Sequence, residues 1–229
     1  MSKLFIILLF PISQLYAALD SVYDFGWLDQ DKEVYVLQNR KFLKQKKIHV
    51  HVGGGLTTNG AFVDTTVLQG RLGYFATENY GFEMLYSKQS AKENETAALV
   101  RNNGGAGSTP FRRLVDNYFG AMFLWSPFYS KINTFNAILY YDLFLGVGYA
   151  KFKESNNGPQ FRNDLFNESV SETHNSFLWQ ITLQFYVTEL INLRLDLATN
   201  HFRADKASDT SVQIWDSNYD FTASMGIHF

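Results

Sequence analysis

Between Lys47 and Phe229 the sequence alternates apolar and polar residues with a period of two. Successive side chains of a β-strand point to opposite faces of a sheet, whereas a helix repeats its apolar residues every three to four positions. The pattern recurs in about eight segments, which predicts an all-β chain. The alternation is clearest late in the chain, where Ile191, Leu193, Leu195 and Leu197 are interleaved with Asn192, Arg194 and Asp196.

The alternation does not by itself show which face of the strands meets water. A soluble sandwich or lipocalin-like barrel would turn its apolar face inward, and a membrane barrel would turn it outward. Charged residues lie on the polar face near the centres of the predicted strands, at Arg71, Glu83, Asp142, Arg194 and Asp196. A soluble barrel would also tolerate these charges, so they favour the membrane orientation only modestly.

Loop lengths and aromatic positions favour the membrane orientation more strongly. Short connections are predicted at 77–80, 126–134 and 188–190, and long polar loops at 91–112, 154–175 and 204–217. Short periplasmic turns and long outer loops are typical of outer-membrane barrels. Aromatic residues form 17% of the chain, and Tyr and Trp favour the bilayer interface. Those at predicted strand ends are Tyr74, Phe75, Phe82, Trp125, Phe128, Tyr129, Phe185 and Phe229.

Hydrocarbon offers the backbone no hydrogen-bonding partner, so transmembrane strands have to close into a ring. We therefore predict a transmembrane antiparallel up-and-down β-barrel of about eight strands over residues 47–229, integral to the outer membrane. A ring of this size leaves an interior that side chains fill, so we expect a polar plug in which the five strand-centre charges pair with one another. A proton path or a narrow ion leak is the alternative. Glycines at 53–55, 146 and 148 are expected to let strands pack closely.

Residues 1–17 have the features of a secretory signal peptide: Lys3, an apolar run from Leu4 to Phe10, Pro11, and a cleavage site ending at Ala17. A membrane anchor is the alternative, but the apolar run is short for a spanning helix. Residues 18–46 follow as a polar N-terminal extension, expected in the periplasm, that ends in a basic cluster. Phe229 resembles the terminal aromatic residue that the barrel assembly machinery reads as a sorting signal.

Composition and histidine positions bear on chemistry. The net charge of −2 gives no case for a nucleic-acid partner, and the absence of cysteine excludes a thiolate zinc site. We predict no catalytic residue, no cofactor and no metal site. His49 and His51 share one strand face, but no third ligand is indicated, so polar packing is expected instead. The acidic outer loops, which include Glu154 and Glu172, either share divalent cations with lipopolysaccharide or, by default, stay solvated.

His201 is the best candidate for a catalytic residue. Some small barrels are enzymes that act on lipid A or phospholipids, and a hydrolase of that kind needs a nucleophilic serine beside a base at the barrel rim. Ser208 and Ser211 are near in sequence, but no motif fixes them beside His201. The pattern therefore favours a rim histidine among solvated charges.

Three stretches resemble a family of small outer-membrane β-barrel domain proteins of myxobacteria and Bdellovibrio-type predatory bacteria. They are 34–44 (VYVLQNRKFLK), 70–83 (GRLGYFATENYGFE) and 125–148 (WSPFYSKINTFNAILYYDLFLGVG). The motifs within them are Gln38-Asn39-Arg40, Pro127-Phe128-Tyr129 with Lys131, and Asp142; Ser130 departs from the glycine expected there. The resemblance implies a barrel in the outer membrane and no settled activity.

Together these features predict a non-enzymatic scaffold or anchor of the bacterial envelope, surrounded by outer-membrane lipids and lipopolysaccharide. The basic, aromatic-bearing region 18–46 is expected to contact a periplasmic protein. The alternatives are a narrow channel or small-solute transporter, a lipid A-modifying enzyme, and an adhesin that uses the long loops.

Overall fold

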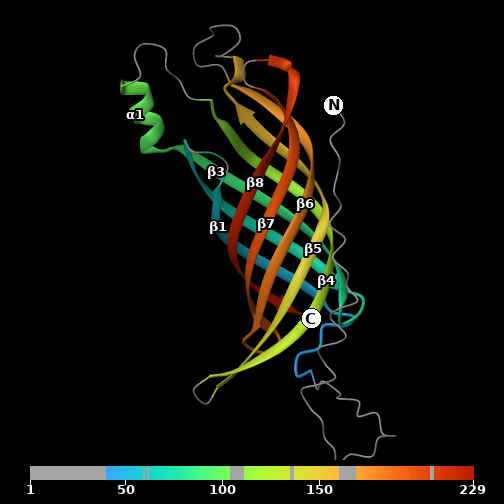
Figure 1. The fold of residues 1–229 in the computed structure, drawn as a ribbon. Coiled ribbons are helices and arrows are strands. Elements are labelled where there is room, and N and C mark those ends of the chain that lie inside the picture. Colours follow the sequence, from blue (N-terminus) through green and yellow to red (C-terminus); the bar gives the residue numbers. More distant parts are fainter. Residues whose placement is uncertain are drawn as a thin grey trace, which may run out of the picture. The chain divides into compact units, whose positions relative to one another are not determined.

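The barrel lies in the compact unit Arg40–Phe229. The computed structural model describes residues 40–58, 60, 62–103, 111–134, 137–159, 169–206 and 209–229. The expected signal peptide and most of the expected N-terminal extension lie outside these residues. Among the described residues, eight antiparallel strands pair in sequence order and β1 pairs with β8 to close the ring (Figure 1). The predicted up-and-down β-barrel is therefore confirmed.

The strands are long for a globular protein, and within the described residues a short helix follows the third strand. The strands are β1 Ile48–Thr58, β2 Val63–Phe75, β3 Tyr80–Glu93, β4 Arg113–Thr134, β5 Ala137–Asn156, β6 Val170–Tyr186, β7 Ile191–Lys206 and β8 Asp209–His228. The helix α1, Glu95–Asn103, follows β3. It begins where the Asn94 side-chain oxygen accepts the backbone N–H of Ala97, as an N-cap does. No helix in the described part of the chain is long and apolar enough to cross a membrane.

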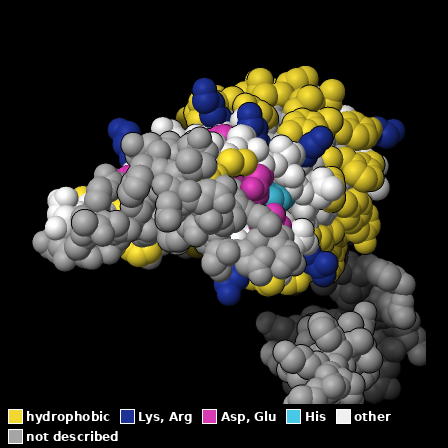
Figure 2. Space-filling model, turned by 90° about the horizontal axis from the view of Figure 1, so that it is seen from above, with side chains coloured by type: hydrophobic (Ala, Val, Ile, Leu, Met, Phe, Trp, Pro, Cys, Tyr) yellow, Lys and Arg dark blue, Asp and Glu magenta, His cyan; other side chains and the backbone are white. Residues whose placement is uncertain are grey.

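The alternation of the sequence sorts the side chains between the two faces of the barrel. In β7, Leu193 and Leu195 are 41% and 39% exposed on the outside, whereas Arg194 between them is 1% exposed in the lumen. Figure 2, viewed along the barrel from the α1 end, shows hydrophobic side chains over much of the visible outer surface. An apolar exterior of this extent suits contact with lipid and would be a liability in water.

Aromatic residues line the outer surface near the ends of the strands, but two of the predicted ones, Phe75 and Tyr129, face inward; Tyr129 lies directly across from the lumen residue Asp142. Tyr74, Trp125 and Phe128 are exposed on the outside, but Phe75 is 1% exposed and lies in the lumen. Phe75 packs there against His49, with ring centroids 5.1 Å apart. The prediction for Phe75 was wrong because adjacent residues of one strand point to opposite faces, and Tyr74 occupies the outer one.

Two of the predicted connections belong to strands. Segment 126–134 continues β4, which resumes its pairing with β5 after a bulge between Trp125 and Phe128. Most of segment 204–217 belongs to β7 and β8, which pair as far as Lys206↔Asp209. Backbone hydrogen bonds between strands form in water as well as in lipid, so the ladder extends past the alternating part of the sequence. Of the other predicted connections, 188–190 lies between strands, and 77–80 does so except for Tyr80, which begins β3. The loops predicted at 91–112 and 154–175 overlap the ends of β3, β5 and β6.

The closure of the barrel depends on a close approach of β1 to β8. Val52 pairs with Met225 and Leu56 with Phe221 across this seam. A Cβ atom on Gly55 would overlap the carbonyl oxygen of Phe221, and one on Gly53 would overlap that of Ala223. A Cβ atom on Gly70, by contrast, would meet nothing within 4 Å. The glycines of β1 therefore permit the two strands to reach hydrogen-bonding distance.

We predict that Gly55→Ala impairs barrel closure and costs about 1–3 kcal/mol, because the added methyl group forces the backbones of β1 and β8 apart. The folded fraction is measured as the fast-migrating band of unboiled samples in gel electrophoresis. The matched control is Gly70→Ala, which should keep the wild-type fraction. Equal folded fractions for the two variants would contradict the role of Gly55.

Candidate functional site

Glu83 is the centre of a charge network in the middle of the lumen. Its side chain is buried, and Oε1 lies 2.7 Å from Nη1 of Arg71. Its Oε2 lies 2.6 Å from Nη1 of Arg194 and 3.0 Å from Nε2 of His49. Gln180 donates a further hydrogen bond of 3.3 Å to Oε1. Glu83 of β3 thus joins β1, β2, β6 and β7 across the interior.

The two arginines of this network also contact Asp196. Arg194 donates from Nε to Asp196 at 2.8 Å, and Nε of Arg71 lies 3.8 Å from the same carboxylate. Two guanidinium groups therefore face two carboxylates, and formal charge is balanced. A buried charge left without a partner is costly, so this arrangement holds the centre of the lumen closed. Four of the five predicted lumen charges meet here.

Asp142, the fifth predicted lumen charge, does not join the arginines. It lies at the opposite end of the lumen from α1, where Lys44 binds it with an Nζ–Oδ2 distance of 2.6 Å. Tyr186 donates a 2.5 Å hydrogen bond to the same oxygen, and Lys44 donates another to Ser126. The expected mutual pairing was wrong for Asp142 because the chain before β1 supplies a nearer cation. Burial lowers the pKa of Lys44, and the Asp142 carboxylate opposes that shift.

Residues 40–47, here called the strap, carry Lys44 into the mouth of the barrel. The backbone N–H groups of Lys44 and Gln45 donate to Glu78 in the β2–β3 turn. The hydroxyl oxygen of Tyr129 in β4 accepts the backbone N–H of Lys41 at 3.1 Å. The strap is therefore fixed to one mouth of the barrel through polar contacts to separate hairpins.

Phe42 closes the same mouth with apolar surface. Its ring is buried and stacks on Tyr186 with centroids 4.8 Å apart and planes at 4°. It meets the edge of Tyr140 at 5.3 Å. Sequence reasoning took this segment for the basic end of a polar periplasmic extension. The spacing of Phe42 and Lys44, two residues apart in an extended chain, is the signal that could have placed both side chains on one face.

Asp220 forms a second buried cluster in the lumen that the sequence did not single out. Tyr118 donates to it at 2.5 Å, and Gln89 and Asn218 donate at 3.0 Å and 2.9 Å. Thr57 also donates a short hydrogen bond to this carboxylate. Neutral donors surround the carboxylate, which explains how Asp220 is accommodated in the lumen without a salt bridge to any described residue.

Apolar side chains share the lumen with these polar groups. Leu124, Phe144 and Leu178 are fully buried inside the ring, and Phe152 packs against Phe202 with centroids 4.5 Å apart. The expectation of a purely polar plug was therefore too narrow. Large apolar groups fill interior volume that charges could occupy only at a desolvation cost.

The lumen histidines pack as polar core groups. His49, His51 and His228 lie within 5.3–5.9 Å of one another by ring centroids. His51 lies 2.5 Å from the side-chain oxygen of Asn192, and His228 lies 3.5 Å from Gln184. Each ring is thus held by a neighbour on another strand.

His201 faces outward and contacts a serine that the sequence did not indicate. The indole of Trp179 donates to Nε2 of His201 at 2.9 Å, and Nδ1 lies 2.7 Å from Oγ of Ser217. Because an indole N–H only donates, Nε2 must accept and Nδ1 must carry the proton. His201 therefore donates to Ser217 and is not its base in this arrangement. Ser208 lies outside the described residues.

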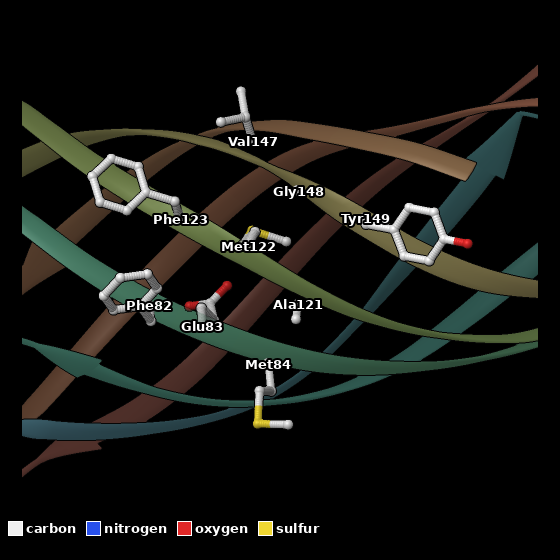
Figure 3. A pocket seen from close by; sticks show the side chains of 9 residues that line it. All are labelled: Phe82, Glu83, Met84, Ala121, Met122, Phe123, Val147, Gly148 and Tyr149. Atoms are coloured by element: carbon white, nitrogen blue, oxygen red, sulfur yellow. The ribbon is translucent and has the colours of Figure 1, made fainter. Parts of the chain in front are cut away.

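A shallow depression of about 350 Å³ lies on the outer surface over β3, β4 and β5. Figure 3 shows its lining, in which the large side chains of Phe82, Phe123 and Tyr149 stand around Ala121 and Gly148. The two small residues create the depression. Its exposed lining is almost wholly apolar, so it suits an acyl chain better than a polar soluble substrate.

The closed ring, apolar exterior and charged interior define the class of the small outer-membrane β-barrels, and this chain is an integral outer-membrane barrel protein. Its fold matches the N-terminal β-barrel domain of OprF from Pseudomonas aeruginosa with a TM-score of 0.50 and 12% identity, covering 81% of this chain and 98% of that one. OprG from the same organism is 12% identical over 82% of this chain and 98% of its own, with a TM-score of 0.41. Neisserial surface protein A is 14% identical over 80% and 96%, with a TM-score of 0.40.

No protein-family model matches the sequence. No curated protein matches it either. The structural likeness at these identities concerns the fold alone, so the resemblance to the family of myxobacteria and Bdellovibrio-type bacteria stays a prediction.

We predict that Glu83→Gln destabilises the barrel by about 3–5 kcal/mol, because it leaves two buried arginines with one carboxylate. The free energy of unfolding is measured by urea titration in lipid vesicles, followed by tryptophan fluorescence. Glu189→Gln, in the exposed β6–β7 turn, is the control and should change stability by less than about 0.5 kcal/mol. A loss at Glu83 no larger than that of the control would show that the network is not needed for stability.

Proposed function

We propose that this chain is a non-enzymatic scaffold or anchor for an envelope complex, held in the outer membrane by its barrel. The observation that carries the proposal is the strap, which occupies one mouth of the barrel through Lys44 and Phe42. A bound segment at the mouth obstructs a path through the barrel. In a barrel that presents the chain preceding it, a fixed strap sets where that chain begins.

The strap lies at the end of the barrel that carries the short turns. Both the start of β1 and the end of β8 are there, where Ile48 exchanges backbone hydrogen bonds with Phe229. In outer-membrane barrels the short turns face the periplasm. The proposed partner is therefore a periplasmic protein, and outer-membrane lipids and lipopolysaccharide surround the wall.

The strap narrows the region that can contact such a partner. Of the region expected from sequence, Ala18 to Lys46, the residues from Arg40 onward bind the barrel itself through Glu78, Tyr129 and Asp142. The partner-binding part is then residues 18–39. In this proposal the strap holds the barrel and the residues before it bind the partner.

Deletion of residues 20–39, with the strap left intact, should abolish specific crosslinking to periplasmic proteins while the barrel still folds. In vivo crosslinking followed by mass spectrometry gives the partner profile, and the unboiled gel band reports folding. A deletion of 104–108, between α1 and β4, is the control and should leave the profile unchanged. An unaltered profile after the 20–39 deletion would refute the scaffold proposal.

The filled lumen argues against a narrow channel, which is the main alternative. The Glu83 network and the Phe42 stack block the interior at two levels. We expect the purified barrel to show no steady conductance in planar lipid bilayers at moderate voltage. Reproducible single-channel currents that vanish on boiling the sample would favour the channel instead.

A further inference from the structure

Three metal-binding side chains meet inside the barrel at the end that carries α1. Glu154 of β5 lies directly across from Glu172 of β6, and His174 lies two residues further along β6. One ligand atom from each of the three lies within 4.8 Å of the others. A small shift of the partly exposed Glu172 would bring all three to the bonding distance of one ion.

The buried carboxylate of Glu154 is incompletely satisfied. Its Oε1 lies 2.9 Å from Nε of Arg113 and 3.1 Å from Nε2 of His174. Its Oε2 is buried and has no hydrogen-bonding partner among the described residues. A buried acceptor without a partner is costly and calls for a cation or a donor.

The local charge also favours a cation. Arg113 is shared between Glu154 and Asp216, to which its Nη1 binds. Arg113 thus binds two carboxylates, and Glu172 adds a third, 3.6 Å from His174. The three carboxylates and one guanidinium group leave a formal charge of −2 with His174 neutral. Like charges directly across an antiparallel pair, as at Glu154 and Glu172, destabilise the sheet. A divalent cation would neutralise the excess negative charge and relieve the repulsion between Glu154 and Glu172.

We propose that Glu154, Glu172 and His174 bind a zinc-class divalent metal ion at this end of the lumen. An imidazole with two carboxylates is a ligand set for zinc and its first-row neighbours, whereas calcium and magnesium take oxygen ligands. Three protein ligands leave a fourth position for water or a donor from outside. The ion links β5 to β6 near the end of the barrel that carries α1, and it stabilises that end.

The ring of His174 is already positioned for this role. It stacks on Phe202 with centroids 5.4 Å apart and planes at 24°. Phe202 is buried and also packs on Phe152, so the histidine is supported by a rigid apolar surface. To bind the ion, Nε2, which donates its proton to Glu154 in this structure, passes that proton to Nδ1 or releases it to solvent and exchanges the contact for a bond to the metal, while Glu172 shifts inward.

The test is calorimetric titration of zinc into the tag-free mature chain, folded in detergent and freed of metal by a chelator. We expect one zinc ion per barrel, a rise in Tm, and at least tenfold weaker binding of calcium. His174→Ala and Glu172→Gln should each weaken zinc binding at least tenfold while the unboiled gel band is retained. His201→Ala, which removes an outward-facing histidine, is the control and should bind zinc as the wild type does.

Three results would overturn the proposal. The first is a wild-type barrel that binds no zinc. The second is wild-type zinc affinity in both site variants, which would place the ion elsewhere, such as among His49, His51 and His228. The third is calcium affinity equal to that for zinc, which would show that the imidazole is not a ligand.

Discussion

The whole molecule depends on the pairing of backbone hydrogen bonds around a closed ring. In hydrocarbon an unpaired N–H or C=O group has no partner, so no strand can be left as an edge. The seam between β1 and β8 satisfies this condition, and it does so at Gly53 and Gly55, where side chains would hold the strands apart. Ring closure then encloses a narrow interior that every inward side chain must share.

The enclosed interior explains the charge pairing. Glu83 faces Arg71 and Arg194, and Asp142 faces Lys44, because a confined charge without a partner would cost more than the fold could offset. The same logic distinguishes the two ends of the barrel. At the turn end the strap supplies the missing cation. At the loop end Arg113 leaves an excess of negative charge, which is where the metal proposal arises.

Much of the fold was predictable because a period of two is a local property. The inward placement of Arg194 and Asp196 and the outward placement of Leu193 followed from their alternation in one segment. Strand ends were less predictable. The pairing of β7 with β8 runs on to Lys206 and Asp209, where the sequence no longer alternates clearly, since backbone hydrogen bonds do not depend on side-chain type. Phe75 was expected among the bilayer-facing aromatic residues because it lies at a strand end, although its position next to Tyr74 places it on the inner face.

The sequence by itself determined which side chains of a strand share a face, because strand geometry links parity to face. Only the tertiary structure decided which lumen groups meet. Lys44 and Asp142 are 98 residues apart, and Glu83 and Arg194 are 111 apart. Their contacts arise from ring closure and from the register between strands. Both depend on how segments far apart in the sequence pair, so no single segment predicts them. Likewise, Glu154 reaches His174 only because β5 and β6 pair where they do.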